Sequence, residues 1–266
     1  MTVGTGAASG NCTANCNAVD TQGTWTTSGG SIWLAGASSY QGLAIANGAA
    51  QVFNTGGGSI TLLGDKIWIS TTTITSTGTL TIAPFATAFT SDFTWSGSLS
   101  GSNFVGTGSI ANMTINTIAN LSGLVIGNSA STANANVTIS SAISIAGPIS
   151  IYGGTITINE NLNTTAGTTS GDILLKSSGD ISIAANKSIT TSGGDVVIWA
   201  NSDTQAPNGS ISLRNSSSIV TGSVSVPGGS IWLGGGGNGT SWNGLNVGSG
   251  YAVPGTSFTP SNGGGG

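Results

Sequence analysis

The sequence predicts an all-β protein, namely a right-handed parallel β-helix (a β-solenoid) with three short strands per coil. Short apolar triplets recur along the chain, such as Ile181-Ser182-Ile183 and Ile211-Ser212-Leu213. Their alternation is typical of strands with one buried face, and Gly-Gly, Gly-Asp and Asn-Gly pairs separate them as turns. Successive triplets start about seven or eight residues apart, so a coil takes roughly 20 to 23 residues, and such a period indicates a repeat architecture.

Three segments follow from this pattern. Residues 1–28 are polar and glycine-rich, and we interpret them as an irregular lead-in. Residues 29–239 are the predicted β-helix, with roughly 11 to 13 coils, and residues 240–266 form a Gly/Ser-rich C-terminal segment. The side chains expected to point inward are Ile173, Leu175, Ile181, Ile183, Val196, Ile198, Ile211, Leu213, Ile231 and Leu233.

The same six residues, Gly-Gly-Ser-Ile-Trp-Leu, stand at 29–34 and at 228–233. The chain therefore ends on the kind of unit with which it begins. A contact between two unlike ends that does not close on itself generates an open filament. We accordingly predict a head-to-tail homopolymer, in which the protein's partner is a second copy of itself.

Aromatic side chains gather in residues 83–108, where we expect a distorted coil; they include Phe85, Phe89, Phe93, Trp95 and Phe104. In one interpretation they fill the core of an enlarged coil. In the other they form an exposed platform that stacks on sugar rings, because aromatic residues combine a large apolar face with specific geometry. Host or matrix glycans would then be partners, and a polysaccharide-binding or polysaccharide-cleaving module is the alternative function.

Composition excludes several function classes. Only 5% of the 266 residues are charged, there is no His, and the net charge is −4. The four basic residues are scattered, whereas nucleic-acid binding needs a clustered basic footprint. No apolar run approaches the roughly 18 residues of a membrane span. The first ten residues lack the basic and apolar regions of a signal peptide, so a removed signal or a longer parent protein both remain open.

Cys12 and Cys16 lie close together in sequence. We predict a disulfide between them, which fits an oxidising extracellular setting; two free thiols are the alternative. Neither a metal site nor a cofactor is predicted. The eight acidic residues are interpreted as turn caps rather than catalytic pairs, so no enzymatic activity is expected. Asp172 and Asp180 should lie at different corners, and Asp180 and Asp203 are spaced to stack one coil apart.

A second alternative function is ice binding, since threonines alternate from Thr71 to Thr81. These threonines occupy one region and do not recur at the coil period, which argues against a flat threonine array.

The run GDILLKSSGDISIAANKSITTSGGDVVIWANSD, with the later GGSIWLGGG, resembles the repeat regions of filamentous-haemagglutinin-like surface proteins, which are secreted bacterial adhesins. The resemblance is clear over about residues 137–248. The resemblance implies a secreted, elongated β-helical body located outside the cell or on its surface, with a role in attachment or biofilm-matrix building. The predicted function is a non-catalytic fibre subunit or adhesin.

Overall fold

The structure is a computed structural model of the whole chain. It describes residues 17–21, 23–36, 41–45, 51–65, 67–69, 72–89, 92–95, 109–110, 113–115, 121–129, 135–165, 171–202, 209–235, 245–247 and 256–258. All regular elements in these ranges are β-strands, and no helix occurs among them. The predicted all-β class is therefore confirmed.

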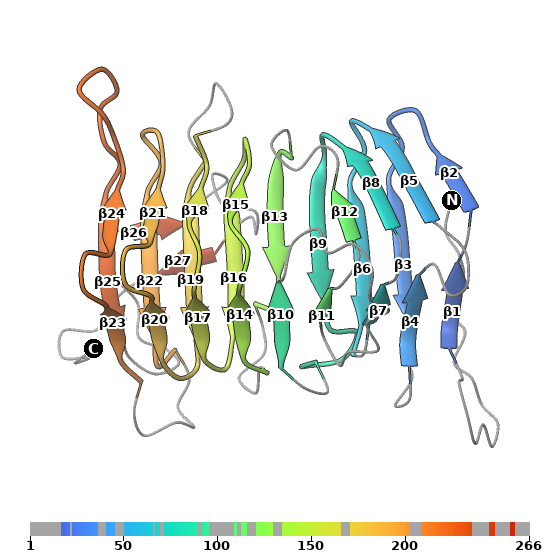
Figure 1. Cartoon of the computed structure of the whole chain (residues 1–266), viewed down its shortest axis with the longest axis horizontal. Coiled ribbons are helices and arrows are strands. Elements are labelled where there is room, and N and C mark those ends of the chain that lie inside the picture. The colour runs from blue at the N-terminus through green and yellow to red at the C-terminus, as the bar shows by residue number, and fades with distance from the viewer. Residues whose placement is uncertain are drawn as a thin grey trace.

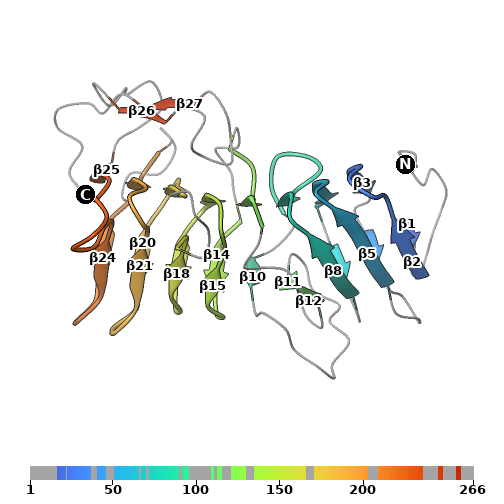
Figure 2. The same ribbon diagram turned by 90° about the horizontal axis from the view of Figure 1, so that it is seen from above.

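The longest sheet, called the long sheet below, extends from one end of the molecule to the other (Figures 1 and 2). Its strands, all parallel, are β3 (Ile32–Gly36), β6 (Ile60–Gly64), β9 (Thr79–Ala83), β13 (Gly123–Ile126), β16 (Ile149–Gly153), β19 (Ile173–Ser177), β22 (Val196–Ala200) and β25 (Ile231–Gly235).

Shorter parallel sheets form the other sides. The six-stranded sheet comprises β11 (Ser109–Ile110), β10 (Phe93–Trp95), β14 (Val137–Ile139), β17 (Ile156–Ile158), β20 (Ile181–Ile183) and β23 (Ile211–Leu213). One four-stranded sheet contains β12 (Met113–Ile115), β8 (Thr72–Ser76), β5 (Gln51–Gly56) and β2 (Gly23–Thr26), and the other contains β15 (Ile143–Ser144), β18 (Leu162–Asn163), β21 (Ser188–Thr190) and β24 (Ser218–Val220).

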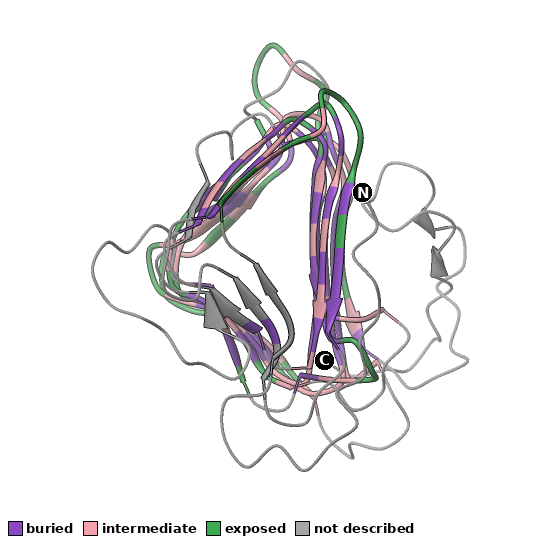
Figure 3. Cartoon of the chain, turned by 90° about the vertical axis from the view of Figure 1, so that its right-hand side faces the viewer, coloured by how far each residue is buried: buried purple, intermediate pink, exposed green. Residues whose placement is uncertain are grey.

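Two small sheets complete the described structure. One joins β1 (Asn17–Thr21), β4 (Gln41–Ile45) and β7 (Ile67–Ile69) in parallel, and the other pairs β26 (Leu245–Val247) with β27 (Thr256–Phe258) antiparallel. Seen end-on, the strands outline a tube with three sides (Figure 3). Parallel sheets in this arrangement are consistent with a β-helix or β-solenoid.

The spacing between layers varies along the chain. Among the described residues the long sheet has eight strands, and the 11 to 13 coils expected for the chain remain a prediction. Its paired residues Ile60 and Leu80 are 20 positions apart, but Leu80 and Leu124 are 44 apart, and Val196 and Ile231 are 35 apart. The interval between β9 and β13 contains three strands of other sheets, β10, β11 and β12, so the spacing between layers is not constant along the chain. Strands β1 and β2 also lie within the expected irregular lead-in.

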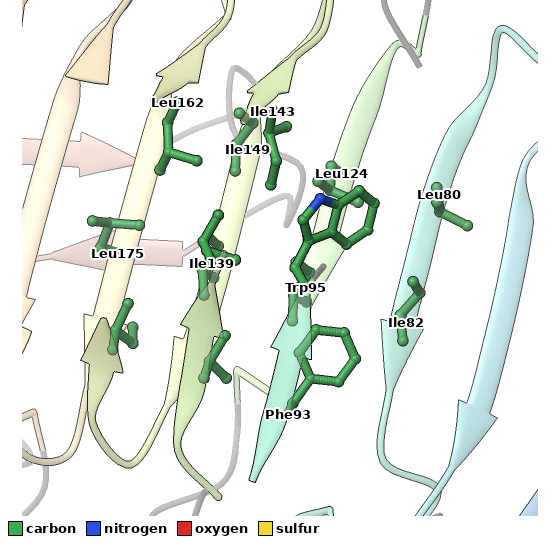
Figure 4. Packing of buried hydrophobic residues seen from close by; sticks show 14 of the residues in the cluster. Leu80, Ile82, Phe93, Trp95, Leu124, Ile139, Ile143, Ile149, Leu162 and Leu175 are labelled. Atoms are coloured by element: carbon green, nitrogen blue, oxygen red, sulfur yellow. The ribbon is translucent and has the colours of Figure 1, made fainter. Parts of the chain in front are cut away.

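The core is a continuous stack of inward-facing aliphatic side chains. In the long sheet Ile149 pairs with Ile173, which pairs with Val196, so each layer covers the one before. Ten side chains of this stack are labelled in Figure 4. The six predicted inward residues of β19, β20 and β22 are buried, and Ile211 packs against the core.

Glycines form a second column at the corner before the long sheet. A Cβ atom on Gly58 would lie 2.1 Å from the carbonyl oxygen of Gly30, and one on Gly194 would lie 2.4 Å from that of Gly171. Such separations leave no room for any side chain. Glycine therefore recurs at this corner, where the backbones of successive layers approach each other directly. The layer of β13 is the exception, because Ser122 takes the place that glycine has in the other layers, and Gly147 lies against its carbonyl oxygen.

Side-chain oxygens hold this corner on both sides of the glycine. The Asp195 amide donates to an Asp172 carboxylate oxygen (2.7 Å), and the Ser230 amide donates to Asp195 (2.6 Å). The Thr55 hydroxyl donates to the Gly58 carbonyl oxygen (2.7 Å), as the Thr191 hydroxyl does to that of Gly194. These bonds satisfy corner backbone groups that strand pairing leaves free.

We expect Gly58→Ala to lower the free energy of unfolding by about 1 to 3 kcal/mol, because the added methyl group overpacks a rigid backbone contact. Gly57→Ala is the matched control, since its Cβ would lie 3.9 Å from the nearest atom, Thr77 Oγ1. This control should change stability by less than about 1 kcal/mol. Urea denaturation measures both variants, and equal losses would contradict the glycine-column account.

Candidate functional site

The C-terminal end of the strand stack is the candidate site, and it is formed by β23, β24 and β25. Its large apolar side chains are Leu213, Val220, Ile231 and Leu233, each between 41% and 48% exposed. Ile231 and Leu233 pair with Val196 and Ile198, so they occupy core-facing positions. Their predicted inward orientation agrees with this register, but no further described layer covers them.

The strands at this end also have free edges. Each of β23, β24 and β25 is the last strand of its sheet, and no described strand pairs with its outer side. A free edge presents a row of unpaired backbone donors and acceptors, which is a template for another strand. Exposed apolar side chains beside such an edge mark an interaction surface.

The opposite end of the long sheet carries the same six residues in a different environment. Ile32 and Leu34 of β3 are 1% and 0% exposed, whereas the equivalent Ile231 and Leu233 of β25 are 46% and 48% exposed. The two hexapeptides are therefore the first and last strands of one sheet. The difference in exposure between the identical residues of β3 and β25 indicates how much side-chain surface of β25 a covering partner could bury.

The carboxylates whose contacts the structure describes form hydrogen bonds or ion pairs within the fold. Asp172 and Asp180 lie before strands of different sheets, as predicted, and Asp180 accepts bonds from the amide and hydroxyl of Ser210 (2.7 and 2.8 Å). Glu160 forms an ion pair with Lys187 at 2.8 Å. Asp203 lies outside the described residues, and the acids that stack one layer apart are Asp172 and Asp195.

The Asp172–Asp195 pair has the clearest electrostatic effect. Burial raises the pKa of the Asp172 carboxyl, the bond from the Asp195 amide lowers it, and the negative charge of Asp195 raises it. Among the described residues no three His, Cys, Asp or Glu side chains come together as a metal site would need.

The predicted glycan-stacking residues are not brought together on the surface. Phe89, Phe93 and Trp95 are buried, Phe89 stacks on Phe93 with ring centroids 5.2 Å apart, and only Phe85 is exposed, at 40%. Figure 4 shows Phe93 and Trp95 projecting from β10 among core side chains. The core-filling interpretation is correct for these three, because the wide layer at β10 needs large side chains.

The structure does not describe some of the predicted site residues, and it divides the threonine run. Phe104 lies outside the described residues, as do Cys12 and Cys16. The threonine run divides between two sheets, because Thr73 and Thr75 belong to β8 and Thr79 and Thr81 to β9. One flat array of these threonines is therefore not formed.

A second buried layer lies on the outside of the long sheet, and the sequence analysis did not foresee it. Tyr152 pairs with Lys176, which pairs with Trp199, and the Lys176 ammonium lies 4.9 Å from the centre of the Trp199 ring. Lys176 Nζ also donates to the Ser129 carbonyl oxygen (3.4 Å). The sequence feature that could have revealed this layer is the fourth residue of each strand, which is large in Ile-Ser-Ile-Tyr, Ile-Leu-Leu-Lys and Val-Val-Ile-Trp.

Two hydroxyl groups in this layer make no hydrogen bond of ordinary length, although the Ser150 hydroxyl lies near enough to the Tyr152 phenol to lower its pKa slightly against the larger effect of burial. They are the Tyr152 phenol, 2% exposed, and the Ser150 hydroxyl, 0% exposed. Burial also raises the pKa of Tyr152 and lowers that of Lys176. An unpaired buried hydroxyl is destabilising, since it has lost its bonds to water.

Comparison with known proteins gave no match: no protein-family model, no curated protein and no solved structure matches the chain. No described helix is long and apolar enough to cross a membrane. The proposals below accordingly depend on the geometry and on the sequence pattern.

We expect Tyr152→Phe to raise the free energy of unfolding by about 1 to 3 kcal/mol at neutral pH, because it removes an unpaired buried hydroxyl. The gain should increase above pH 10, the ordinary pKa of tyrosine. There the unfolded chain releases the phenol proton while the folded chain retains it, so the stability of the wild-type protein falls as pH rises.

Denaturation of wild type and Tyr152→Phe at pH 7 to 11 measures this difference. Ser150→Ala is the control, since it removes the neighbouring hydroxyl and keeps the phenol, so its stability should still fall as the pH rises above 10. A Tyr152→Phe protein less stable than wild type at pH 7 would show that the phenol has a partner.

Proposed function

We propose that this protein is a non-catalytic structural subunit of an extracellular bacterial fibre or an adhesin, and that copies join head to tail. The main support for this proposal is the repeated hexapeptide, whose Ile-Trp-Leu part begins both end strands of the long sheet. Its Ile and Leu are buried in β3 and half-exposed in β25. The resemblance to filamentous-haemagglutinin-like surface proteins supports a location outside the cell.

The architecture that we propose for the subunit is a right-handed parallel β-helix with three strands per coil. Consecutive strands β16, β17 and β18 belong to three different sheets, and β19, β20 and β21 repeat that order. The right hand follows from a general rule, because parallel crossover connections within a sheet are right-handed in about 98% of cases.

At the proposed junction, β3 of the next copy continues the long sheet beyond β25. The register of the sheet would place Ile231 beside Ile32 of the next copy, and Ser230 beside Ser31 of the next copy. Fully burying an Ile or Leu side chain contributes about 1.5 to 3 kcal/mol. Because β3 is covered within its own chain, the covering residues must leave its edge before the next copy adds.

Removing the apolar surface of β25 should prevent assembly. We expect the average particle mass of the wild-type protein to increase with protein concentration. High salt should not prevent this increase, because salt screens charges and has little effect on apolar and main-chain contacts. Ile231→Asp/Leu233→Asp should remain monomeric. Thr157→Asp/Ser182→Asp, which adds the same charge to outward positions of β17 and β20, is the control; static light scattering distinguishes the variants.

An engineered disulfide tests the orientation of the copies. Ser31→Cys and Ser230→Cys, made together in a Cys12→Ser/Cys16→Ser background, lie at opposite ends of one chain. Seven strand spacings separate them, roughly 34 Å, whereas a disulfide needs Cα atoms within about 7 Å. Oxidation should give a ladder of covalent oligomers on non-reducing gels.

Each single-cysteine protein is a control for this cross-link. Ser31→Cys alone and Ser230→Cys alone should give no ladder. Dimers of Ser230→Cys alone would show that two C-terminal ends meet, and purely monomeric double variant at high concentration would show that the ends do not join. Either result would contradict head-to-tail assembly.

A further inference from the structure

A ladder of hydrogen bonds follows the corner of the long sheet, through the residue beside the start of each strand. In this ladder a backbone amide donates to the side-chain oxygen of the equivalent residue one layer nearer the N-terminal end. The Ser59 amide donates to Ser31 Oγ (3.1 Å), and the Thr79 amide donates to Ser59 Oγ (3.2 Å). At the other end of the sheet, the Ser230 amide donates to Asp195 Oδ1 (2.6 Å). The rungs thus join the first three described layers of the sheet, and they join the last three.

The middle of the sheet shows that a donor and its acceptor are lost together. Gly123 and Pro148 occupy the equivalent positions in the layers of β13 and β16, because the residues that follow them, Leu124 and Ile149, are paired. Gly123 has no side-chain oxygen to accept a bond, and Pro148 has no amide hydrogen to donate one. The missing rung therefore leaves no backbone donor unsatisfied between these two layers.

The two ends of the ladder hold complementary halves of a rung. Ser31 Oγ accepts the bond from Ser59, whereas no described residue accepts a hydrogen bond from the Ser31 amide. The Ser230 amide is bonded to Asp195, whereas no described residue donates to the Ser230 hydroxyl. Both end serines are exposed. A free amide at one end and a free acceptor at the other can complete a rung only when unlike ends meet.

We infer that the Ser31 amide of one copy donates to the Ser230 hydroxyl of the preceding copy, and that this bond selects the orientation in which copies join. The inference rests on the proposed head-to-tail junction, because the register of the long sheet places these two serines side by side there. Stacking of the apolar side chains carries no such direction, since the hydrophobic effect is non-directional. Ser230 is therefore the residue that distinguishes the N-terminal end of a second copy from its C-terminal end.

The accepting side of the bond is tested by two variants of the full chain. Ser230→Ala removes the accepting oxygen, and Ser230→Asn replaces it with an amide oxygen. Asparagine forms such a rung elsewhere in the protein, since Asn136 Oδ1 accepts a bond from the Thr155 amide (2.8 Å). We expect Ser230→Ala to lower the association constant about two- to tenfold, the effect of one hydrogen bond, and Ser230→Asn to associate like the wild type. Sedimentation velocity over a series of concentrations measures the constant.

The donating side is tested by Ser31→Pro, which removes the amide hydrogen, with Ser31→Ala as its matched control. Both variants lose the hydroxyl that accepts from Ser59, so the loss of that internal rung is common to them. Proline suits this position, because Gly147-Pro148 stands in the β16 layer where Gly30-Ser31 stands in the β3 layer. We expect Ser31→Pro to associate about two- to tenfold more weakly than Ser31→Ala.

A double-variant cycle shows whether the two serines share one bond. Ser230→Ala and Ser31→Pro remove the two halves of the same rung, so the double variant should associate no more weakly than the weaker single variant. Additive losses, or association of Ser230→Ala equal to that of the wild type, would overturn this inference and leave the head-to-tail proposal intact. A wild-type protein that stays monomeric at high concentration would overturn both. If Ser31→Pro does not fold, the comparison of Ser230→Ala with Ser230→Asn decides alone.

Discussion

Direct backbone contact at one corner is the constraint on which the rest of the structure depends. Before the strands of the long sheet, the glycine of one layer lies against the carbonyl group of the glycine one layer below, as Gly194 lies against Gly171. No side chain fits between two such glycines, and Ser122 of the β13 layer is the one departure from glycine among the described layers. This contact allows successive layers to pair at the spacing of parallel strands. At the corner, the Asp195 amide donates to Asp172 and the Thr191 hydroxyl donates to the Gly194 carbonyl oxygen.

The fixed register between neighbouring strands of the long sheet determines which side chains stack on one another. Inward aliphatic side chains stack on their equivalents, so each layer is covered by the next and an end layer is covered by nothing of its own sheet. Both end strands lack a neighbour on one side, but Ile32 and Leu34 of β3 are buried whereas Ile231 and Leu233 of β25 are half-exposed. The proposed head-to-tail contact uses the same kind of packing that stabilises the interior.

Much of the fold could be predicted from sequence because strand pattern is a local property. Ile181 and Ile183 alternate with a serine and are buried as expected. The spacing between layers could not be predicted, since it depends on connection lengths such as the one between Leu80 and Leu124. The candidate site was foreseen only as a repeated hexapeptide. Exposure of Ile231 depends on its position at the end of the stack, which triplet spacing does not encode.

The outer layer was missed for a related reason. Tyr152 and Trp199 point away from the core, and an outward aromatic residue is normally read as exposed. Their burial depends on packing from outside the strand itself, and single-strand patterns carry no information about such packing. Composition was more informative about the corners, where glycine follows from the close backbone approach.

Electron microscopy of concentrated protein tests the central claim most directly, because head-to-tail continuation of the eight-stranded long sheet fixes the repeat of the filament. Eight strand spacings give an axial rise of about 38 Å per subunit. The account predicts unbranched filaments with this rise and with β-strands perpendicular to the axis. Discrete particles, or filaments whose subunit rise is unrelated to the strand spacing, would contradict it.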